Sequence, residues 1–96
     1  MEFSLCERSS RDLEVTYRDG RAVAAYLYFA RRSGEKSVRT ERRECGLVVD
    51  FADNDRPIGI EITAPEALSL EALNRALIAL DQEPATAQEI APLAAA

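Results

Sequence analysis

One stretch of the chain, residues 46–62, constrains the fold more than any other, because two runs of alternating apolar residues flank a cluster of turn-forming residues. The apolar positions are Leu47, Val49 and Phe51 in the first run and Ile58, Ile60 and Ile62 in the second. Side chains two residues apart in a strand lie on the same face, so each run predicts a strand with one apolar face. Together the two runs predict a β-hairpin.

The two apolar faces of this hairpin meet in one register, since a slip by one residue would turn one apolar set toward water. The predicted pairs are Leu47 with Ile62, Val49 with Ile60 and Phe51 with Ile58. They leave Asn54 and Asp55 as a two-residue turn, and both residue types tolerate the positive φ that such a turn requires. On the other face, the register places Asp50 opposite Gly59, with Glu61 diagonally beside Asp50.

The carboxylates of Asp50 and Glu61 are the one pair for which the sequence suggests chemistry, either acid–base work or binding of a divalent cation. The alternative is two solvated acids on the outer face of a hairpin. We favour the solvated acids, because a working site adds further convergent ligands and the sequence indicates none. The chain has no histidine, which excludes the common histidine-dependent nucleophile and zinc sites. We therefore expect no enzymatic activity, no metal and no cofactor.

A second hairpin is predicted upstream, with its first strand carrying apolar residues at Leu13, Val15 and Tyr17. Gly20 can take the left-handed position of a three-residue loop, which would place Val15 across from Val23 and Leu13 across from Ala25. The second strand, residues 22–30, is apolar on both faces and is predicted to be the central strand.

A third, polar strand is predicted over residues 36–44, where Val38 is the one aliphatic residue. A strand of this kind belongs at the edge of a sheet or against a partner chain.

These strands resemble the bacterial domain-of-unknown-function family 2283. The resemblance rests on Asp50-Phe51, the acidic turn and the run Ile58-Gly59-Ile60-Glu61-Ile62, together with Val15-Thr16-Tyr17 and Ala24-Ala25-Tyr26-Leu27-Tyr28. Its motif residues are Asp50, Gly59 and Glu61, and by pattern it covers roughly residues 13–70. The chain departs from the family at Asp55, where a glycine is usual, and by one extra residue near Gly20. The resemblance implies a small β-meander with a helix, and no known function.

After the hairpins the periodicity changes to that of a helix. Thr63 and Glu66 have the spacing of a capping box, Pro65 fits a first helical turn, and Ser69 can cap the main helix. The apolar stripe of that helix consists of Leu70, Leu73, Leu77 and Leu80. Pro84 is predicted to end the helix, and the alanine-rich tail that follows to dock or fray.

The predicted fold class is therefore α+β: an antiparallel β-meander of four to five strands with one amphipathic C-terminal helix packed on one face. We expect one domain over residues 1–96, since a chain this short builds one core. Its predicted parts are an edge or flexible segment (1–12), the meander (13–62), the helix (63–83) and the tail (84–96).

The charge of the chain is segregated. The net charge is −5, yet residues 31–43 hold six basic and two acidic residues, a local +4 against −9 for the remainder. Arg39, Arg42 and Arg43 are candidate partner-binding residues in this stretch. They could contact phosphates or an acidic protein. Nucleic acid is the less favoured partner, because the acidic body repels the same phosphate backbone, and a solvated edge is the simplest interpretation of the stretch.

Tyr26 and Tyr28 are further candidate partner-binding residues. They could stack on bases, but aromatic residues in strands are more often packing units of a core or an interface. One helix covers one side of a sheet, so Tyr26, Tyr28 and Val48 need other cover. A homodimer would bury them. The alternative is that the C-terminal tail folds back over this face.

The leading functional hypothesis is a non-enzymatic interaction module that acts as a homodimer or as an accessory subunit, such as an antitoxin-like partner of a small toxin. The alternatives are a nucleic-acid binder through the basic strand and a metal or acid–base site at Asp50 and Glu61. The chain contains no apolar run of transmembrane length and no basic segment followed by an apolar one at its start. We therefore expect no membrane association and a cytoplasmic location.

Overall fold

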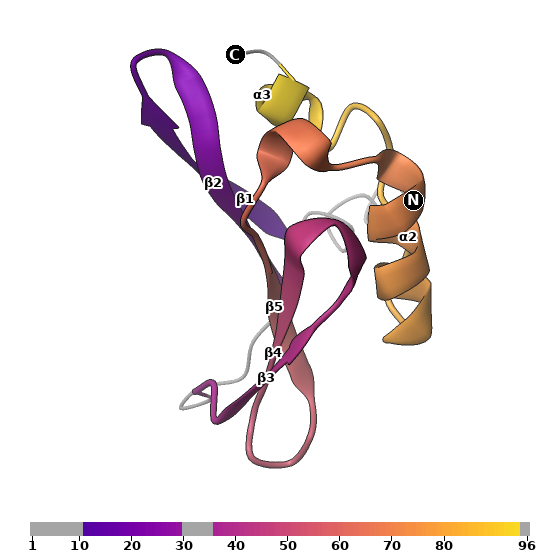
Figure 1. Ribbon diagram of the computed structural model, residues 1–96. Coiled ribbons are helices and arrows are strands. Elements are labelled where there is room, and N and C mark those ends of the chain that lie inside the picture. Colours follow the sequence, from indigo (N-terminus) through magenta and orange to yellow (C-terminus); the bar gives the residue numbers. More distant parts are fainter. Residues whose placement is uncertain (1–10, 30–35, 95–96) are drawn as a thin grey trace, which may run out of the picture.

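A computed structural model describes residues 11–29 and 36–94 of the protein (Figure 1). The strands are β1 (Asp12–Arg18), β2 (Arg21–Tyr28), β3 (Arg39–Arg42), β4 (Leu47–Phe51) and β5 (Pro57–Ile62). The helices are the 3₁₀ turns η1 (Glu44–Gly46) and η2 (Pro65–Ala67), and the α-helices α2 (Leu70–Ala79) and α3 (Ala91–Ala94). Most of the predicted edge segment 1–12, the last residue of the predicted second strand (Ala30) and residues 31–35 of the basic stretch lie outside the described residues.

The five strands form one antiparallel sheet in the order β1-β2-β5-β4-β3. This confirms the α+β class, the meander-like sheet and the position of the polar third strand at an edge. The central strand is β5, however, and not β2 as predicted. β2 lies between β1 and β5, which still gives it neighbours on both sides.

The first hairpin has a tighter turn than the predicted three-residue loop. Asp19 (φ 53°) and Gly20 (φ 78°) both take positive φ and form a two-residue turn, the conformation that matches the strand twist. A regular two-residue hairpin would set Glu14 against the apolar face. The structure avoids this with a β-bulge at Val23, which shifts the register by one residue so that Val15 faces Ala25 and Leu13 faces Leu27. The predicted pairs of Val15 with Val23 and of Leu13 with Ala25 were therefore wrong.

The second hairpin confirms most of the predicted register: Leu47 pairs with Ile62, Val49 with Ile60 and Asp50 with Gly59. The pair of Phe51 with Ile58 was wrong, because Phe51 lies opposite Pro57 and the register shifts there. The loop has three residues, 53–55, and is closed by hydrogen bonds between Ala52 and both Arg56 and Asp55. Asp55 takes the positive φ (65°), as in the loop type that ends with a left-handed residue.

The helical region is divided into η2 and α2. Ser69 caps α2 by accepting a hydrogen bond from the Ala72 amide at 3.0 Å. The predicted capping box does not form, because the Thr63 hydroxyl donates instead to the carbonyl of Gly46 at 2.7 Å. Nor does Pro84 end the helix. α2 ends at Ala79, followed by Asp81 with φ 60°, a left-handed residue of the kind that terminates helices.

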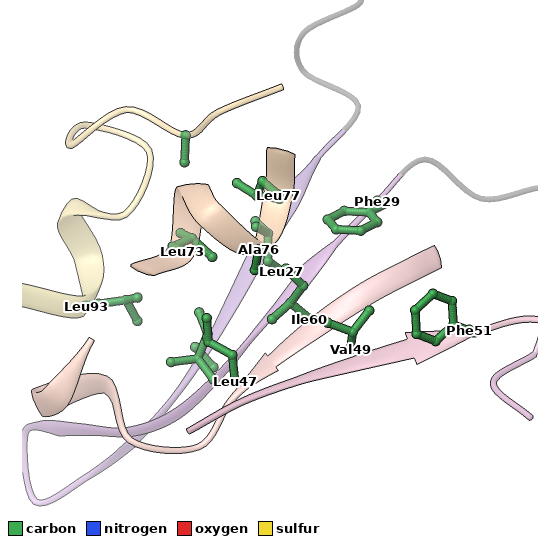
Figure 2. Packing of buried hydrophobic residues seen from close by; sticks show 13 residues of the cluster. Leu27, Phe29, Leu47, Val49, Phe51, Ile60, Leu73, Ala76, Leu77 and Leu93 are labelled. Atoms are coloured by element: carbon green, nitrogen blue, oxygen red, sulfur yellow. The ribbon is translucent and has the colours of Figure 1, made fainter. Parts of the chain in front are cut away.

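The apolar side chains of the sheet and of α2 form the core on one face of the sheet, which we call the covered face (Figure 2). The fully buried large side chains are Leu27, Leu47, Val49, Ile60, Ile62, Leu73 and Leu77. Leu93 of α3 belongs to the same cluster. The C-terminal tail therefore packs on the covered face and does not close the other face of the sheet, the alternative raised by the sequence.

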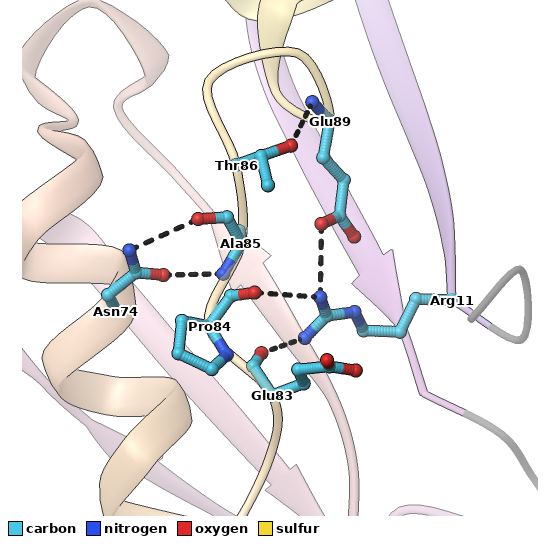
Figure 3. A network of polar contacts seen from close by, with 7 residues as sticks. All are labelled: Arg11, Asn74, Glu83, Pro84, Ala85, Thr86 and Glu89. Carbon is cyan, nitrogen blue, oxygen red and sulfur yellow. Dashed lines mark hydrogen bonds and ion pairs between the residues drawn. The ribbon is translucent and has the colours of Figure 1, made fainter.

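A polar network attaches this tail to the rest of the protein (Figure 3). The Asn74 side chain forms two hydrogen bonds with the backbone of Ala85, at 2.6 and 3.2 Å. Arg11, just before β1, donates to the carbonyls of Glu83 and Pro84 and forms an ion pair with Glu89 at 3.0 Å. These contacts satisfy backbone groups of an irregular segment and explain how it docks without regular secondary structure.

Candidate functional site on the open face of the sheet

The second face of the sheet carries the outward residues of all five strands, and no described helix packs on it (Figure 1). We call it the open face. Its residues follow from the strand register and are Asp12, Glu14, Thr16, Ala24, Tyr26, Tyr28, Thr40, Arg42, Val48, Asp50, Gly59 and Glu61. Both predicted tyrosines and all three family-motif residues therefore lie on one surface.

Tyr26 connects three strands of this face. From β2 its ring crosses β5 above Gly59, and its hydroxyl donates to Oδ2 of Asp50 on β4 at 2.5 Å. A Cβ atom placed on Gly59 would lie 2.3 Å from Cε1 of Tyr26, a distance that real contacts do not reach. Glycine at position 59 therefore allows the aromatic ring to pass directly over the backbone of β5.

Tyr28, also on β2, makes a similar contact but reaches toward β1, whereas Tyr26 reaches toward β4. The Tyr28 hydroxyl donates to Oε1 of Glu14 on β1 at 2.7 Å. The two tyrosine rings lie 4.5 Å apart between centroids, tilted by 39°, within the range of favourable aromatic pairs. Sequence reasoning missed Glu14, although the alternation of Leu13 and Val15 already placed Glu14 on the face opposite the core.

Asp50 and Glu61 lie diagonally on the open face, as the register predicted. Asp50 is half-buried and accepts the Tyr26 hydroxyl, whereas Glu61 is exposed opposite Tyr26. Within residues 11–29 and 36–94, no three His, Cys, Asp or Glu side chains are grouped so that they could hold a metal ion. The observed role of Asp50 is to hold the ring of Tyr26 over Gly59.

The three predicted partner-binding arginines do not share one surface: Arg39 and Arg43 both pair with Glu41, whereas Arg42 lies on the open face. Arg39 lies at the rim of the covered face, 4.1 Å above the ring of Phe51, and pairs with Glu41 and Asp55 at 2.5 and 3.0 Å. The hydrogen bond from Arg39 lowers the pKa of Glu41 below its usual value, and the same bond raises the pKa of Arg39. Arg39 is thus already paired within the chain.

Arg43 and Arg42 point to different surroundings. Arg43 pairs with Glu41 at 2.8 Å and lies beside Ala72 and Ala76 of α2. Arg42 lies opposite Val48 and is exposed on the open face, at the β3 edge. Of the three arginines, Arg42 is the one that shares a surface with the tyrosines.

Two shallow depressions lie beside η2 and α3, away from the open face. They have volumes of about 200 and 720 Å³ and share Pro65, Leu68 and Leu93 in their walls. The smaller depression is lined mainly by apolar residues, whereas the larger one also has Arg21, Thr63 and Glu66 in its wall. Neither brings together a nucleophile with a base. The open face is therefore the stronger candidate for function.

The fold and the open face together define a class: a small α+β protein whose antiparallel sheet is packed against helices on one side and lined by tyrosines and carboxylates on the other. Residues 19–64 match the model of a family described as a protein of unknown function, DUF2283. The match confirms the resemblance predicted from the sequence, and it spans β2 to β5 with the tyrosines and the motif residues.

Neither the curated proteins nor the solved structures contain a match to the chain. Among the described residues, no helix has the length and apolar character needed to cross a membrane.

Proposed function

We propose that the protein is a non-enzymatic interaction module that assembles with a second protein chain through the open face, in the first place as a homodimer. The observation that supports this proposal is the pair of contacting tyrosine rings on a sheet face that no described helix covers. Aromatic residues are enriched at interfaces, where their rings bury large areas at a low cost in side-chain entropy.

The composition of the open face supports binding over catalysis. Tyr26 and Tyr28 hold the carboxylates of Asp50 and Glu14 in fixed positions. Fixed polar groups around an aromatic centre are typical of a protein interface. The same groups lack the nucleophile and the neighbouring base that a hydrolytic site requires.

The same surface would serve an accessory subunit, for example an antitoxin-like protein bound to a small toxin. Binding of nucleic acid is less favoured, because Arg39 and Arg43 are engaged with Glu41 and Asp55 inside the chain. We expect the protein to act in the cytoplasm.

Light scattering across a dilution series tests the homodimer. We expect the mass of the wild-type protein to rise from that of one chain to that of two as the concentration increases. The variant Tyr28→Asp is expected to stay monomeric, since it places a charge at the centre of the interface. Ile78→Asp is the matched control: Ile78 is 59% exposed on α2, so this variant should dimerise like the wild type.

A wild-type chain that is monomeric at every concentration would contradict the homodimer. Co-expression with the proteins encoded by adjacent genes then tests the accessory subunit. Co-purification that Tyr28→Asp abolishes and Ile78→Asp preserves would support it, and its absence with every neighbour would overturn the interaction module.

A further inference from the structure

Two rows of side chains cross the open face from one edge of the sheet to the other. The strand register places Glu14, Tyr26, Glu61, Val48 and Arg42 in one row, and Asp12, Tyr28, Gly59, Asp50 and Thr40 in the next. Each row thus contains one residue from each strand, with β5 in the middle.

Charge is distributed unevenly along these rows. Asp12 and Glu14 lie on β1 at one edge of the face, and Arg42 lies on β3 at the opposite edge. All three side chains are exposed. The middle of the face contains the tyrosine pair, so the pattern runs from acidic through aromatic to basic.

We propose that the homodimer is a face-to-face pair of sheets related by a two-fold axis that runs along β5. This proposal rests on the homodimer proposed above and specifies its geometry. Such an axis exchanges the two edges of the sheet, so β1 of one chain lies over β3 of the other. Glu14 of each chain then pairs with Arg42 of its partner, twice per dimer.

The distances involved suit this arrangement. Two sheets pack about 10 Å apart with their strands roughly aligned, a gap that the long side chains of a glutamate and an arginine span from opposite sides. Glu14 already accepts the Tyr28 hydroxyl through Oε1, which orients the carboxylate. An ionised carboxylate has about four lone-pair sites, so it can also accept from a guanidinium group.

A residue on β5 allows a test in which the proposed arrangement predicts whether dimer affinity rises or falls. Glu61 lies on the central strand, close to the proposed axis, where it faces the same residue of the partner. Like charges across an interface are unfavourable. Glu61→Gln is therefore expected to increase the affinity of the dimer. If a basic protein bound the open face instead of a second copy of the chain, the same substitution would weaken binding.

Charge reversal provides the decisive experiment, with the dissociation constant measured by analytical ultracentrifugation. Glu14→Arg and Arg42→Glu alone are each expected to weaken the dimer by about tenfold or more, because each disrupts both ion pairs. The double variant Glu14→Arg/Arg42→Glu should regain an affinity near that of the wild type. An equimolar mixture of the two single variants should also associate, because their heterodimer contains two opposite-charge pairs.

Glu71→Arg is the control for net charge, since Glu71 is exposed on α2 away from the open face. It changes the charge of the chain as Glu14→Arg does and should leave the affinity nearly unchanged. A dimer that tolerates both single reversals, or that Glu61→Gln weakens, would overturn this geometry while the homodimer stands. A wild-type chain that never dimerises would overturn both.

Discussion

The covered face and the open face belong to the same five strands, yet they are built on different chemistry. Val49 and Ile60 on the covered face are fully buried under α2. Of their neighbours on the open face, Val48 is half-buried and Glu61 is exposed. The covered face is mainly aliphatic, and the open face is organised by hydrogen bonds from two tyrosines. Because strand residues alternate between faces, adjacent positions can serve stability and binding separately.

The energetics of the two faces differ in the same way. Burying an aliphatic side chain stabilises a fold by about 1.5–3 kcal/mol, whereas a hydrogen bond contributes about 0.5–1.5 kcal/mol net. The seven fully buried side chains in the core between the covered face and α2 thus outweigh the two tyrosine–carboxylate bonds of the open face. We infer that the covered face provides most of the stability of the fold.

The largest expected effect compares two adjacent valines on β4 that point to opposite faces. Val49→Ala should reduce the free energy of unfolding by about 2–3 kcal/mol, because it removes two buried methyl groups and leaves a cavity. Val48→Ala makes the same chemical change on the open face and should cost less than about 1 kcal/mol. Urea denaturation of both variants at one low protein concentration measures the difference, and equal losses would contradict the contrast between the faces.

Much of this two-faced sheet could be predicted from the sequence, because the covered face depends on a regular pattern. The alternation from Leu47 to Ile62 gave the correct partners for Val49 and Asp50. The stripe containing Leu73 and Leu77 gave the face of α2 that is buried. Period-2 and period-3.6 patterns of apolar residues are strong signals, since burial rewards every residue in them.

Local irregularities could not be predicted, because several turn types fit the same residues. The bulge at Val23 adds one residue to β2, and the left-handed Asp55 belongs to a loop that is one residue longer than predicted. The left-handed Asp81 follows a helix that ends earlier than predicted. Such choices differ by small local energies that packing decides. The order of the strands also depends on the β2–β5 pairing, which no turn signal marks.

The sequence predicted which residues lie on the open face, but not which of them form hydrogen bonds with one another. The register placed Tyr26, Asp50 and Gly59 on one face, yet only the structure shows the ring crossing Gly59 to reach Asp50. The direction in which a long side chain leans along a sheet is not encoded by alternation. For the same reason the sequence did not indicate that Arg39 would pair with Glu41 and Asp55.

Gly59→Ala tests how tightly the open face itself is packed. The new methyl group would collide with the ring of Tyr26, so we expect a loss of about 1–3 kcal/mol from forced rearrangement. In the background of Tyr26→Ala the collision is absent, and the same substitution should then cost much less. A full double-mutant cycle by urea denaturation measures this coupling, and strictly additive losses would show that the ring does not lie over Gly59.

Asp55→Gly tests the register that assigns residues to the two faces. Asp55 closes the β4–β5 loop with φ 65°, a conformation that glycine adopts without strain. We expect the substitution to be neutral or to stabilise the fold by up to about 1 kcal/mol, even though it removes the exposed ion pair with Arg39. Thermal denaturation measures the effect. Asp53→Gly in the same loop is the control, and a clear loss specific to Asp55→Gly would contradict the positive φ and the register built on it.

The smallest expected effect is a pH dependence that belongs to the covered side alone. Arg75 of α2 forms an ion pair with Glu44 of η1 at 2.6 Å and so joins the helix to the sheet. Its hydrogen bond lowers the pKa of Glu44 below the usual 4.5. The folded state therefore binds this proton less readily than the unfolded state, and the stabilisation is present above pH 4.5 and lost as the pH falls through the lower folded pKa.

Because both side chains are exposed, the contribution of this ion pair is small and screened by salt. Comparison of the urea midpoints of the wild type and Glu44→Gln should show a difference near pH 7 that shrinks as the pH falls below 4.5 and through the lower folded pKa. A difference that persists at low pH would mean that Glu44 stabilises α2 by a contact other than its charge.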